Sequence, residues 1–300
     1  MFMNKMMITL FSMLLTISMS HAGTKLTILV ENNDGNVPGL KAENGFSLLI
    51  EKNGSDYLYD TGMSGTCVRN AVVLKKDLSK VSKVFLSHGH RDHTGGLDQV
   101  LAAIGHPVEI VAHPDVFGRK VLGRMFPVGI PFTEKELKNK YRVIFDFQKN
   151  LSKVDEGIWL TGEVPMLNDK ETIPPQARVQ VNGHLERDFI LDDNSMAIET
   201  GKGLVIVMGC GHRGVINILS FIRKNLKKPV YAIIGGMHME SADGEHIKFV
   251  EQELREIIRL DHTQVLAPCH CTGKREIAEL RKAFPEIFMD AHTGTSFEFP

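Results

Sequence analysis

The stretch of sequence that decides the fold reads Val84-Phe85-Leu86-Ser87-His88-Gly89-His90-Arg91-Asp92-His93-Thr94-Gly95-Gly96. It opens with an apolar run that is typical of a buried strand, and it ends in a glycine pair before a helical pattern. Residues two apart on an extended chain point the same way, so His88 and His90 can reach one metal ion together. The chain must then bend, which allows Asp92 and His93 to face a neighbouring position. The stretch therefore predicts a metal site at the end of a strand.

The donor types in this stretch narrow the choice of metal. Imidazole and carboxylate suit zinc, and they also suit iron or manganese where carboxylates dominate. We expect zinc, as one or two ions, with manganese or iron as alternatives. A polar surface loop is the competing interpretation. Four ligand-type residues within six positions on a strand-to-helix turn favour the metal site instead.

The composition fits a globular protein and argues against nucleic-acid binding. Of the 300 residues, 43% are hydrophobic, which is enough for one large core or two modest ones. The 35 lysines and arginines nearly balance the 36 aspartates and glutamates, whereas a protein that binds a nucleic-acid backbone usually shows a basic excess. We therefore expect a small-molecule substrate and no nucleic acid as partner. The oligomeric state stays open.

The first 22 residues differ from the rest of the chain. Lys5 is their only formal charge, and an apolar run from Met6 to Met19 precedes the small-x-small sequence Ser20-His21-Ala22. This pattern predicts a secretory signal peptide, residues 1–22, that is cleaved after Ala22. An uncleaved membrane anchor is the alternative, but the run is shorter than the roughly 20 residues that span a bilayer. We expect a secreted protein, most simply in a bacterial periplasm, without membrane attachment after cleavage.

The cysteines do not predict a disulfide framework. There are only four, namely Cys67, Cys210, Cys269 and Cys271. An exported protein can form disulfides, but the last two cysteines flank a single histidine, and a bridge between them would be strained. Some of these thiols are candidates for the metal pocket instead.

Strand patterns and amphipathic helix patterns alternate along residues 23–300, which predicts α/β layers in a single domain. Residues from about 117 to 140 lack a clear period, and we expect an insertion there, over the mouth of the site. Asn168 to Gly183 reads as a second long loop, and Tyr141 to Phe147 as a strand. Periodicity alone leaves open whether the layers form a four-layer sandwich or a doubly wound sheet.

Further candidate ligands directly follow predicted strands. They are Cys210, His212, His238 and His270. In layered α/β folds the loops beyond the strand ends build the site, so these residues can meet the first histidines in space. His212 and His270 are the better ligand candidates, and His238 is more consistent with substrate binding or proton transfer. Cys210 either binds metal as a thiolate or is a small buried residue.

The pattern His-x-His-x-Asp-His at residues 88–93 resembles the signature of the metallo-β-lactamase superfamily. The resemblance implies a four-layer αβ/βα sandwich, with two sheets face to face and helices outside. It also implies that Asp60, at a strand end, supports the metal histidines, because a histidine ligand usually needs an orienting partner. A helix cap or turn is the alternative role for Asp60.

The chain also departs from the common pattern of that superfamily. No Pro-Gly-His-Thr motif precedes the last sheet, and Gly209-Cys210 stands where a Gly-Asp pair with a bridging carboxylate is usual. A β-lactam substrate is therefore not expected, and the number of metal ions stays open at one or two.

Several motifs are instead similar to one branch of the superfamily, whose members carry the name dihydropterin-ribofuranosylaminobenzene-phosphate synthase. The motifs are Asp60-Thr61-Gly62, Thr161-Gly162-Glu163-Val164-Pro165, Gly209-Cys210-Gly211-His212 and Pro268-Cys269-His270-Cys271-Thr272-Gly273. The likeness runs from about Thr27 to Phe299, nearly the whole mature chain. The name implies cytoplasmic cofactor synthesis, which an exported protein would not serve.

We expect a metal-dependent hydrolase. One ion would be held by His88, His90 and His212 and would lower the pKa of bound water towards about 7. Asp92, with His93 and His270, would hold a second ion or orient that water as general base, and His238 would contact substrate or move a proton. The branch resemblance makes a phosphoester or phosphodiester the first substrate expectation, and a lactone or thioester the second.

Two other functions remain open at this stage. One is a transferase of the synthase type, which would join a pterin to a phosphorylated ribosyl arene. The other is a metal-binding protein without catalysis, which the complete ligand set at residues 88–93 argues against.

Overall fold

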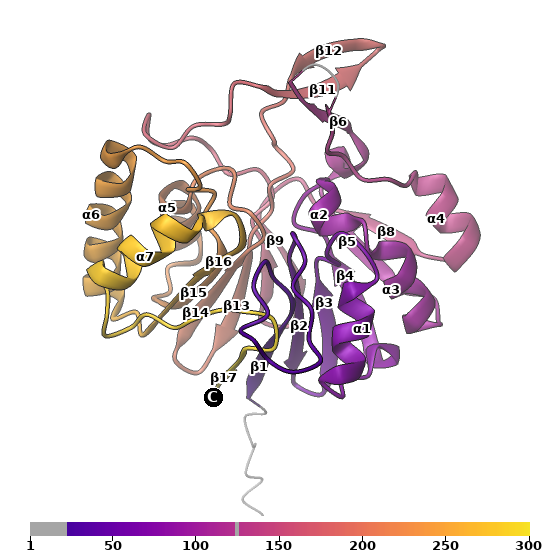
Figure 1. Ribbon diagram of the computed structural model, residues 1–300, viewed down its shortest axis with the longest axis horizontal. Helices are drawn as coiled ribbons and strands as arrows, with labels where there is room; N and C mark the ends of the chain where they lie inside the picture. The colour runs from indigo at the N-terminus through magenta and orange to yellow at the C-terminus, as the bar shows by residue number, and fades with distance from the viewer. Residues whose placement is uncertain (1–22, 124–125) are drawn as a thin grey trace, which may run out of the picture.

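The computed structural model describes residues 23–123 and 126–300. The expected signal peptide, residues 1–22, lies outside this part of the chain. The described residues form two large β-sheets that face one another, with helices on the outer side of each (Figure 1). This arrangement is the expected four-layer αβ/βα sandwich. No helix of the described residues is long and apolar enough to cross a membrane.

The first sheet has seven strands in the order β17-β1-β2-β3-β4-β5-β8. Their bounds are β1 Thr24–Val30, β2 Ser47–Lys52, β3 Ser55–Tyr59, β4 Val81–Phe85, β5 Glu109–Ala112, β8 Ile144–Phe147 and β17 Ser296–Phe299. Leu48 and Ile50 of β2 face the second sheet, while Leu49 between them packs on the helical side. Because the sheet is covered on both faces, its strands need apolar residues at successive positions and not only at every second one. The helices on this side are α1 (Thr66–Val73), α3 (Leu97–Ile104) and α4 (Glu134–Tyr141).

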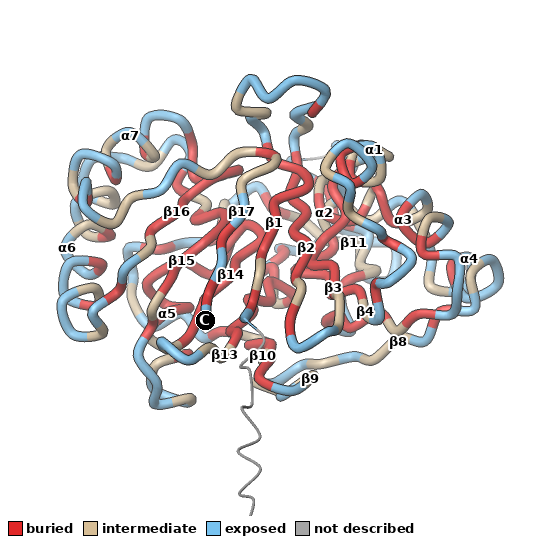
Figure 2. Tube along the Cα trace, turned by 90° about the horizontal axis from the view of Figure 1, so that it is seen from below, coloured by how far each residue is buried: buried red, intermediate tan, exposed pale blue. Residues whose placement is uncertain are grey.

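The second sheet has six strands in the order β16-β15-β14-β13-β10-β9. Their bounds are β9 Ser152–Asp155, β10 Ile158–Leu160, β13 Met196–Thr200, β14 Gly203–Met208, β15 Val230–Gly236 and β16 Val265–Cys269. Its outer face is covered by α5 (Val215–Leu226), α6 (Gly244–Asp261) and α7 (Lys274–Ala283). Figure 2 shows buried residues along the strands and exposed residues on the outer helices. The main core therefore lies between the two sheets.

A small third sheet of four strands stands above the strand ends (Figure 1). Its order is β12-β11-β6-β7, with β6 Arg119–Leu122, β7 Phe126–Pro127, β11 Ala177–Val181 and β12 His184–Arg187. The expectation of a loop over residues 168–183 is wrong at β11. A hairpin turn joins β11 to β12 at Asn182-Gly183, where both residues have positive φ angles of 50° and 84°. Asn-Gly is the dipeptide that favours such a turn.

The segment around residues 117–140 has more regular structure than its sequence pattern predicts. It contains β6 and β7 and most of α4, whose start is fixed by a capping box between Thr133 and Glu136. Leu137 of α4 is buried against the helices of the first sheet, so it is the part from β6 to Gly129 that borders the candidate site. The strand expected from Tyr141 starts only at Ile144, because Arg142 ends the helix with a φ of +53°.

The parallel strands determine where the loops meet. β3, β4 and β5 run parallel to one another, and so do β14, β15 and β16. The carboxyl ends of parallel strands lie at the same edge of a sheet, and loops at that edge commonly carry the functional residues. Short elements follow three of these ends: α2 Arg91–Thr94, η2 Pro114–Phe117 and η3 His270–Thr272. A further short helix, η1 Leu78–Lys80, directly precedes β4.

Candidate metal centre

The loops that follow the parallel strands of both sheets bring every predicted site residue to one place. The first sheet contributes Asp60 after β3 and the histidine stretch after β4. The second sheet contributes Cys210 and His212 after β14, His238 after β15, and His270 after β16. The ligand-type side chains among them form two groups, which lie side by side.

The first group consists of three histidines, and we call it the tri-histidine group. Its members are His88, His90 and His212. Nε2 of His88 lies 3.0 Å from Nδ1 of His90, and Nε2 of His212 lies 3.2 Å from both atoms. Four-coordinate zinc with bonds of 2.0–2.1 Å to nitrogen separates its ligand atoms by about 3.3 Å. The three nitrogens therefore have the spacing of ligands to one small cation.

The hydrogen bonds of Ser87 decide which nitrogen of His88 carries the proton. The Ser87 hydroxyl donates to Oδ2 of Asp60 at 2.7 Å, because a carboxylate only accepts. With its single proton used there, the Ser87 oxygen accepts from Nδ1 of His88, 2.8 Å away. The Nε2 lone pair of His88 is thus free to face the other two histidines. This is the form that binds a metal.

The second group is the four-residue group, made of Asp92, His93, Cys210 and His270. Nε2 of His93 lies 3.1 Å from Sγ of Cys210 and 3.2 Å from Nε2 of His270. The Cys210 sulfur is 3.4 Å from the same His270 nitrogen, and an Asp92 carboxylate oxygen is also 3.4 Å from it. The sequence left two roles open for Cys210, and the structure places its sulfur among the candidate ligands.

Two oxygen atoms orient the histidines of the four-residue group. Nδ1 of His93 donates to Oδ2 of Asp60 at 2.6 Å. Nδ1 of His270 donates to Oδ1 of Asn32 at 2.9 Å, and the same oxygen accepts the Gly45 N–H, which identifies it as the amide oxygen. Both Nε2 atoms therefore present lone pairs to each other across 3.2 Å. Two facing lone pairs repel unless a cation lies between them, so this pair of nitrogens fits a bound metal ion.

Burial keeps the tri-histidine group neutral and ready to bind. It lowers the pKa of His88 and His212 well below 6.5, with help from the neighbouring histidines, and it lowers the pKa of His90 to about 4. Burial also raises the pKa of the Cys210 thiol, so this thiol loses its proton only to a bound cation. For Asp92, burial raises the pKa, but the electrostatic effect of the neighbouring His93 and His270 imidazoles outweighs burial and holds the pKa below 3.8.

His238 lies beside the tri-histidine group and belongs to neither group. Its ring centroid is 4.2 Å from that of His212, and its backbone has a φ of +46°. Burial, with the charge of His270, lowers its pKa to about 4. His238 is therefore a neutral imidazole at the wall of the cavity. The other strand-end histidine of the first sheet, His113, is buried away from both groups, with Nε2 3.4 Å from Glu163.

A cavity of about 500 Å³ opens onto both groups. Its metal-facing wall includes His90, Asp92, Cys210, His212, His238 and His270. The opposite wall comes from the small sheet and carries Val121, Leu122, Phe126 and Ala177. Phe126 is 69% exposed and Leu122 43%, so large apolar side chains face open space there. Arg91 and Arg178 add positive charge at the rim.

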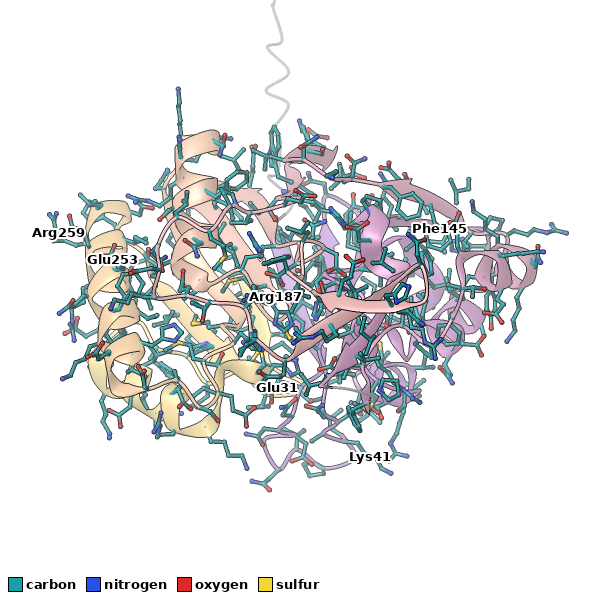
Figure 3. All side chains as sticks on the ribbon, turned by 90° about the horizontal axis from the view of Figure 1, so that it is seen from above. Glu31, Lys41, Phe145, Arg187, Glu253 and Arg259 are labelled. Carbon is teal, nitrogen blue, oxygen red and sulfur yellow. The ribbon has the colours of Figure 1, made fainter. Side chains whose placement is uncertain are left out.

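Two residues that support the site, Glu31 and Asn32, belong to no metal-binding motif in the sequence. Oε1 of Glu31 accepts the His270 N–H at 2.6 Å, and in Figure 3 Glu31 lies between the two halves of the molecule. Glu253 and Arg259 of α6 and Phe145 of β8 lie toward opposite sides in that view. Glu31 and Asn32 directly follow β1. Their place in a polar run after a buried strand is the one sequence feature that could have indicated them.

The fold and the two ligand groups define a metal-binding α/β protein, and comparison with known proteins identifies its family. Residues 40–183 match the model of the metallo-beta-lactamase superfamily. The chain belongs to this superfamily.

Three relatives extend the match beyond residue 183. The chain is 29% identical to the 7,8-dihydropterin-6-methyl-4-(beta-D-ribofuranosyl)-aminobenzene-5'-phosphate synthase of Methanocaldococcus jannaschii, over 92% of this chain and 96% of that protein. It is 26% identical to the uncharacterized protein MJ0448 of the same organism, over 84% and 92%. The crystal structure of Tm1679, described as a metal-dependent hydrolase of the beta-lactamase superfamily, superposes with a TM-score of 0.79 at 25% identity, over 91% of this chain and 98% of that one.

Proposed function

We propose that this protein is a metal-dependent hydrolase that uses a water molecule as nucleophile on a phosphoester, a phosphodiester or a related small ester. The observation that carries the proposal is the convergence of two ligand groups on one cavity. A divalent ion held by the tri-histidine group would lower the pKa of a bound water towards about 7 and would stabilise negative charge on a substrate oxygen. Zinc is the proposed metal, because the thiol of Cys210 suits it better than manganese.

The side chains around the ions have separate tasks in this proposal. Asp92 keeps its charge at neutral pH, so its carboxylate accepts a hydrogen bond from the attacking water and orients it. His238 is neutral, faces the cavity and moves a proton to or from the substrate oxygen. Asp60 and Asn32 hold the ligand histidines in the orientation that binds metal.

The walls of the cavity describe the substrate that we propose. Arg91 and Arg178 suit an anionic group such as a phosphate. The exposed Phe126 and Leu122 suit an apolar body next to the bond that is cleaved. An aryl or alkyl ester of phosphate combines an anionic group with an apolar body, whereas lactones and thioesters match only the apolar wall.

A transferase of the synthase type is the second candidate function. The observation that favours it is the 29% identity to the Methanocaldococcus jannaschii synthase over 92% of this chain. A transferase needs room for two substrates. A second cavity of about 870 Å³ borders the first and shares Asn32, Glu240 and His270 with its wall.

We also propose that the protein is exported, with residues 1–22 as signal peptide, and that it acts on a small molecule. The support is the apolar run and the small-x-small site in the sequence. Detection of a mature N-terminus at Gly23 in protein purified from the periplasm would support export. A full-length chain in the cytoplasm would contradict it.

The experiment that tests the function is a metal-dependent assay of a small substrate panel. The panel contains an aryl phosphodiester, an aryl phosphomonoester, a lactone and a β-lactam, each assayed after chelation and after zinc or manganese is restored. Metal-restored cleavage of one class would establish a hydrolase and its bond, and loss of that cleavage in His90→Ala would tie it to the site. Firmly bound metal without any cleavage would favour the transferase.

A further inference from the structure

One short segment contacts both loops that carry the tri-histidine group. The segment is Asp192-Asp193-Asn194, which connects β12 to β13 and is fully buried. None of its side chains is among the candidate ligands. Three of its hydrogen bonds reach backbone atoms directly next to ligand residues.

Asp192 holds the turn between two ligands. Its Oδ2 accepts the N–H of Gly89 at 2.8 Å, and Gly89 is the residue between His88 and His90. The side of Gly89 is closed, because a Cβ there would overlap the carbonyl oxygen of Val116. The other carboxylate oxygen of Asp192 is 2.8 Å from Nζ of Lys120 on β6, which fixes its orientation.

Asp193 and Asn194 hold the remaining parts of the group. Oδ2 of Asp193 accepts the N–H of Arg213 at 3.0 Å, directly after the ligand His212. The N–H of Asn194 donates to the carbonyl oxygen of Ser87 at 2.8 Å, directly before the ligand His88. The segment itself is anchored, since the Tyr59 hydroxyl donates to the Asn194 carbonyl oxygen at 2.7 Å.

The four-residue group relies on different supports. His93 is oriented by Asp60, and His270 by Asn32 and by Glu31, which accepts its backbone N–H. No hydrogen bond of the described residues joins the 192–194 side chains to this group. The groups share two loops, but the hydrogen bonds beside the ligands of one group differ from those that orient His93 and His270 in the other.

We propose that Asp192 and Asp193 are positioning residues for metal binding at the tri-histidine group and not at the four-residue group. The proposal rests on the metal use of the proposed function, though not on its reaction. Each carboxylate fixes a backbone N–H adjacent to a ligand and adds negative charge near the cation. Both effects strengthen binding in the same direction, and partners of this kind commonly account for roughly tenfold to hundredfold in metal affinity.

Cobalt(II) binding tests the proposal, because cobalt reports the two groups separately. A cobalt ion at the four-residue group gives a thiolate-to-metal absorption band through Cys210, and an ion held by nitrogen ligands alone does not. Asp192→Asn should raise the cobalt dissociation constant of the tri-histidine group, which gives no thiolate band, at least tenfold. The thiolate band, its titration midpoint and the melting temperature should stay near those of the unaltered protein. Asp193→Asn should do the same.

Asp188→Asn is the matched control. Asp188 also pairs with Lys120, at 2.9 Å, so its substitution removes the same charge. The other carboxylate oxygen of Asp188 accepts the Ile190 N–H, which lies outside the ligand loops. Glu31→Gln is the reciprocal control and should weaken the ion with the thiolate band instead. Equal effects of Asp192→Asn and Asp188→Asn, or equal loss of both ions in Asp192→Asn, would overturn the proposal. Two bound cobalt ions without hydrolysis would contradict the proposed function and leave this inference standing.

Discussion

Oδ2 of Asp60 lies 2.6 Å from Nδ1 of His93, and the same oxygen lies 2.7 Å from the Ser87 hydroxyl that accepts from His88. A single carboxylate thus supports one ligand of each group. Asp60 follows β3 with a φ of +59°, a conformation that turns its side chain under both ligand loops. Asparagine and aspartate adopt this conformation more easily than other residues with a side chain.

Asp60→Asn should weaken metal binding at both groups, by roughly tenfold to hundredfold each. The backbone conformation suits asparagine, but its amide nitrogen cannot accept a hydrogen bond. In the place of Oδ2 it loses the bonds from both His93 and the Ser87 hydroxyl, and in the place of Oδ1 it loses the bond from the Ser87 N–H. Competition with a chelator of known affinity would measure both dissociation constants. Weakening of only one group would show that Asp60 does not connect the two.

Cys210→Ser should remove the ion of the four-residue group and leave the ion of the tri-histidine group in place. A serine hydroxyl binds zinc far more weakly than a thiolate does. The measurement is metal content by mass spectrometry, together with the cobalt spectrum. Cys269→Ser is the control, because Cys269 is equally buried but its thiol belongs to neither ligand group, and it should keep both ions.

His238→Gln should lower kcat by about a hundredfold or more without changing metal content. The imidazole is neutral and faces the cavity, and glutamine has similar bulk but cannot accept and release a proton at neutral pH. The measurement is steady-state kinetics on the substrate class that the panel identifies. Unchanged kcat with raised KM would assign His238 to substrate binding alone.

Gly96→Ala should destabilise the protein, on the order of 2–4 kcal/mol. A Cβ at Gly96 would overlap the carbonyl oxygens of Thr61 and Ser64, which are backbone atoms without room to move. Chemical denaturation would measure the change. Gly244→Ala, at the start of α6, is the control, because no atom lies within 4 Å of its added Cβ. If both substitutions had the same small effect, the result would contradict the close contact between Gly96 and the backbone of Thr61 and Ser64.

The thiols should react in an order set by their burial. Burial raises the pKa of Cys67 to about 12, so only a small fraction of this thiol is thiolate at pH 8. Cys271 lines the cavity and is only partly buried. Iodoacetamide at pH 8 should modify Cys271 before Cys67 in the native protein, as peptide mass spectrometry would detect. Early modification of Cys67 would contradict its burial.

The candidate ligands could be selected from the sequence because metal chemistry restricts both their type and their place. Only a few side chains bind zinc, and those that directly follow strands must gather at one sheet edge. His88, Asp92 and His270 could therefore be chosen without the structure. Cys210 could not be decided from the sequence, because its role depends on a 3.1 Å approach to His93 from the opposite sheet.

The supporting residues could not be predicted in the same way. The side chain of Asp192 accepts the backbone N–H of Gly89. Any residue but proline can donate such a bond, so a contact between positions 103 apart leaves no residue pattern. The small sheet was missed for a different reason. Its Asn182-Gly183 turn was present in the sequence, but β12 is exposed along its whole length and so lacks the alternation that marks a strand.

The four-residue group joins His93 to His270, which lie 177 positions apart in the chain. An ion held there is a cross-link between the first sheet and the last strand of the second, so it limits the freedom of the chain as a disulfide would. During synthesis the tri-histidine group is complete as soon as His212 has emerged, whereas the second group must wait for His270. A chain that ends before His270 therefore lacks a ligand of the second group, although it can contain all three ligands of the first.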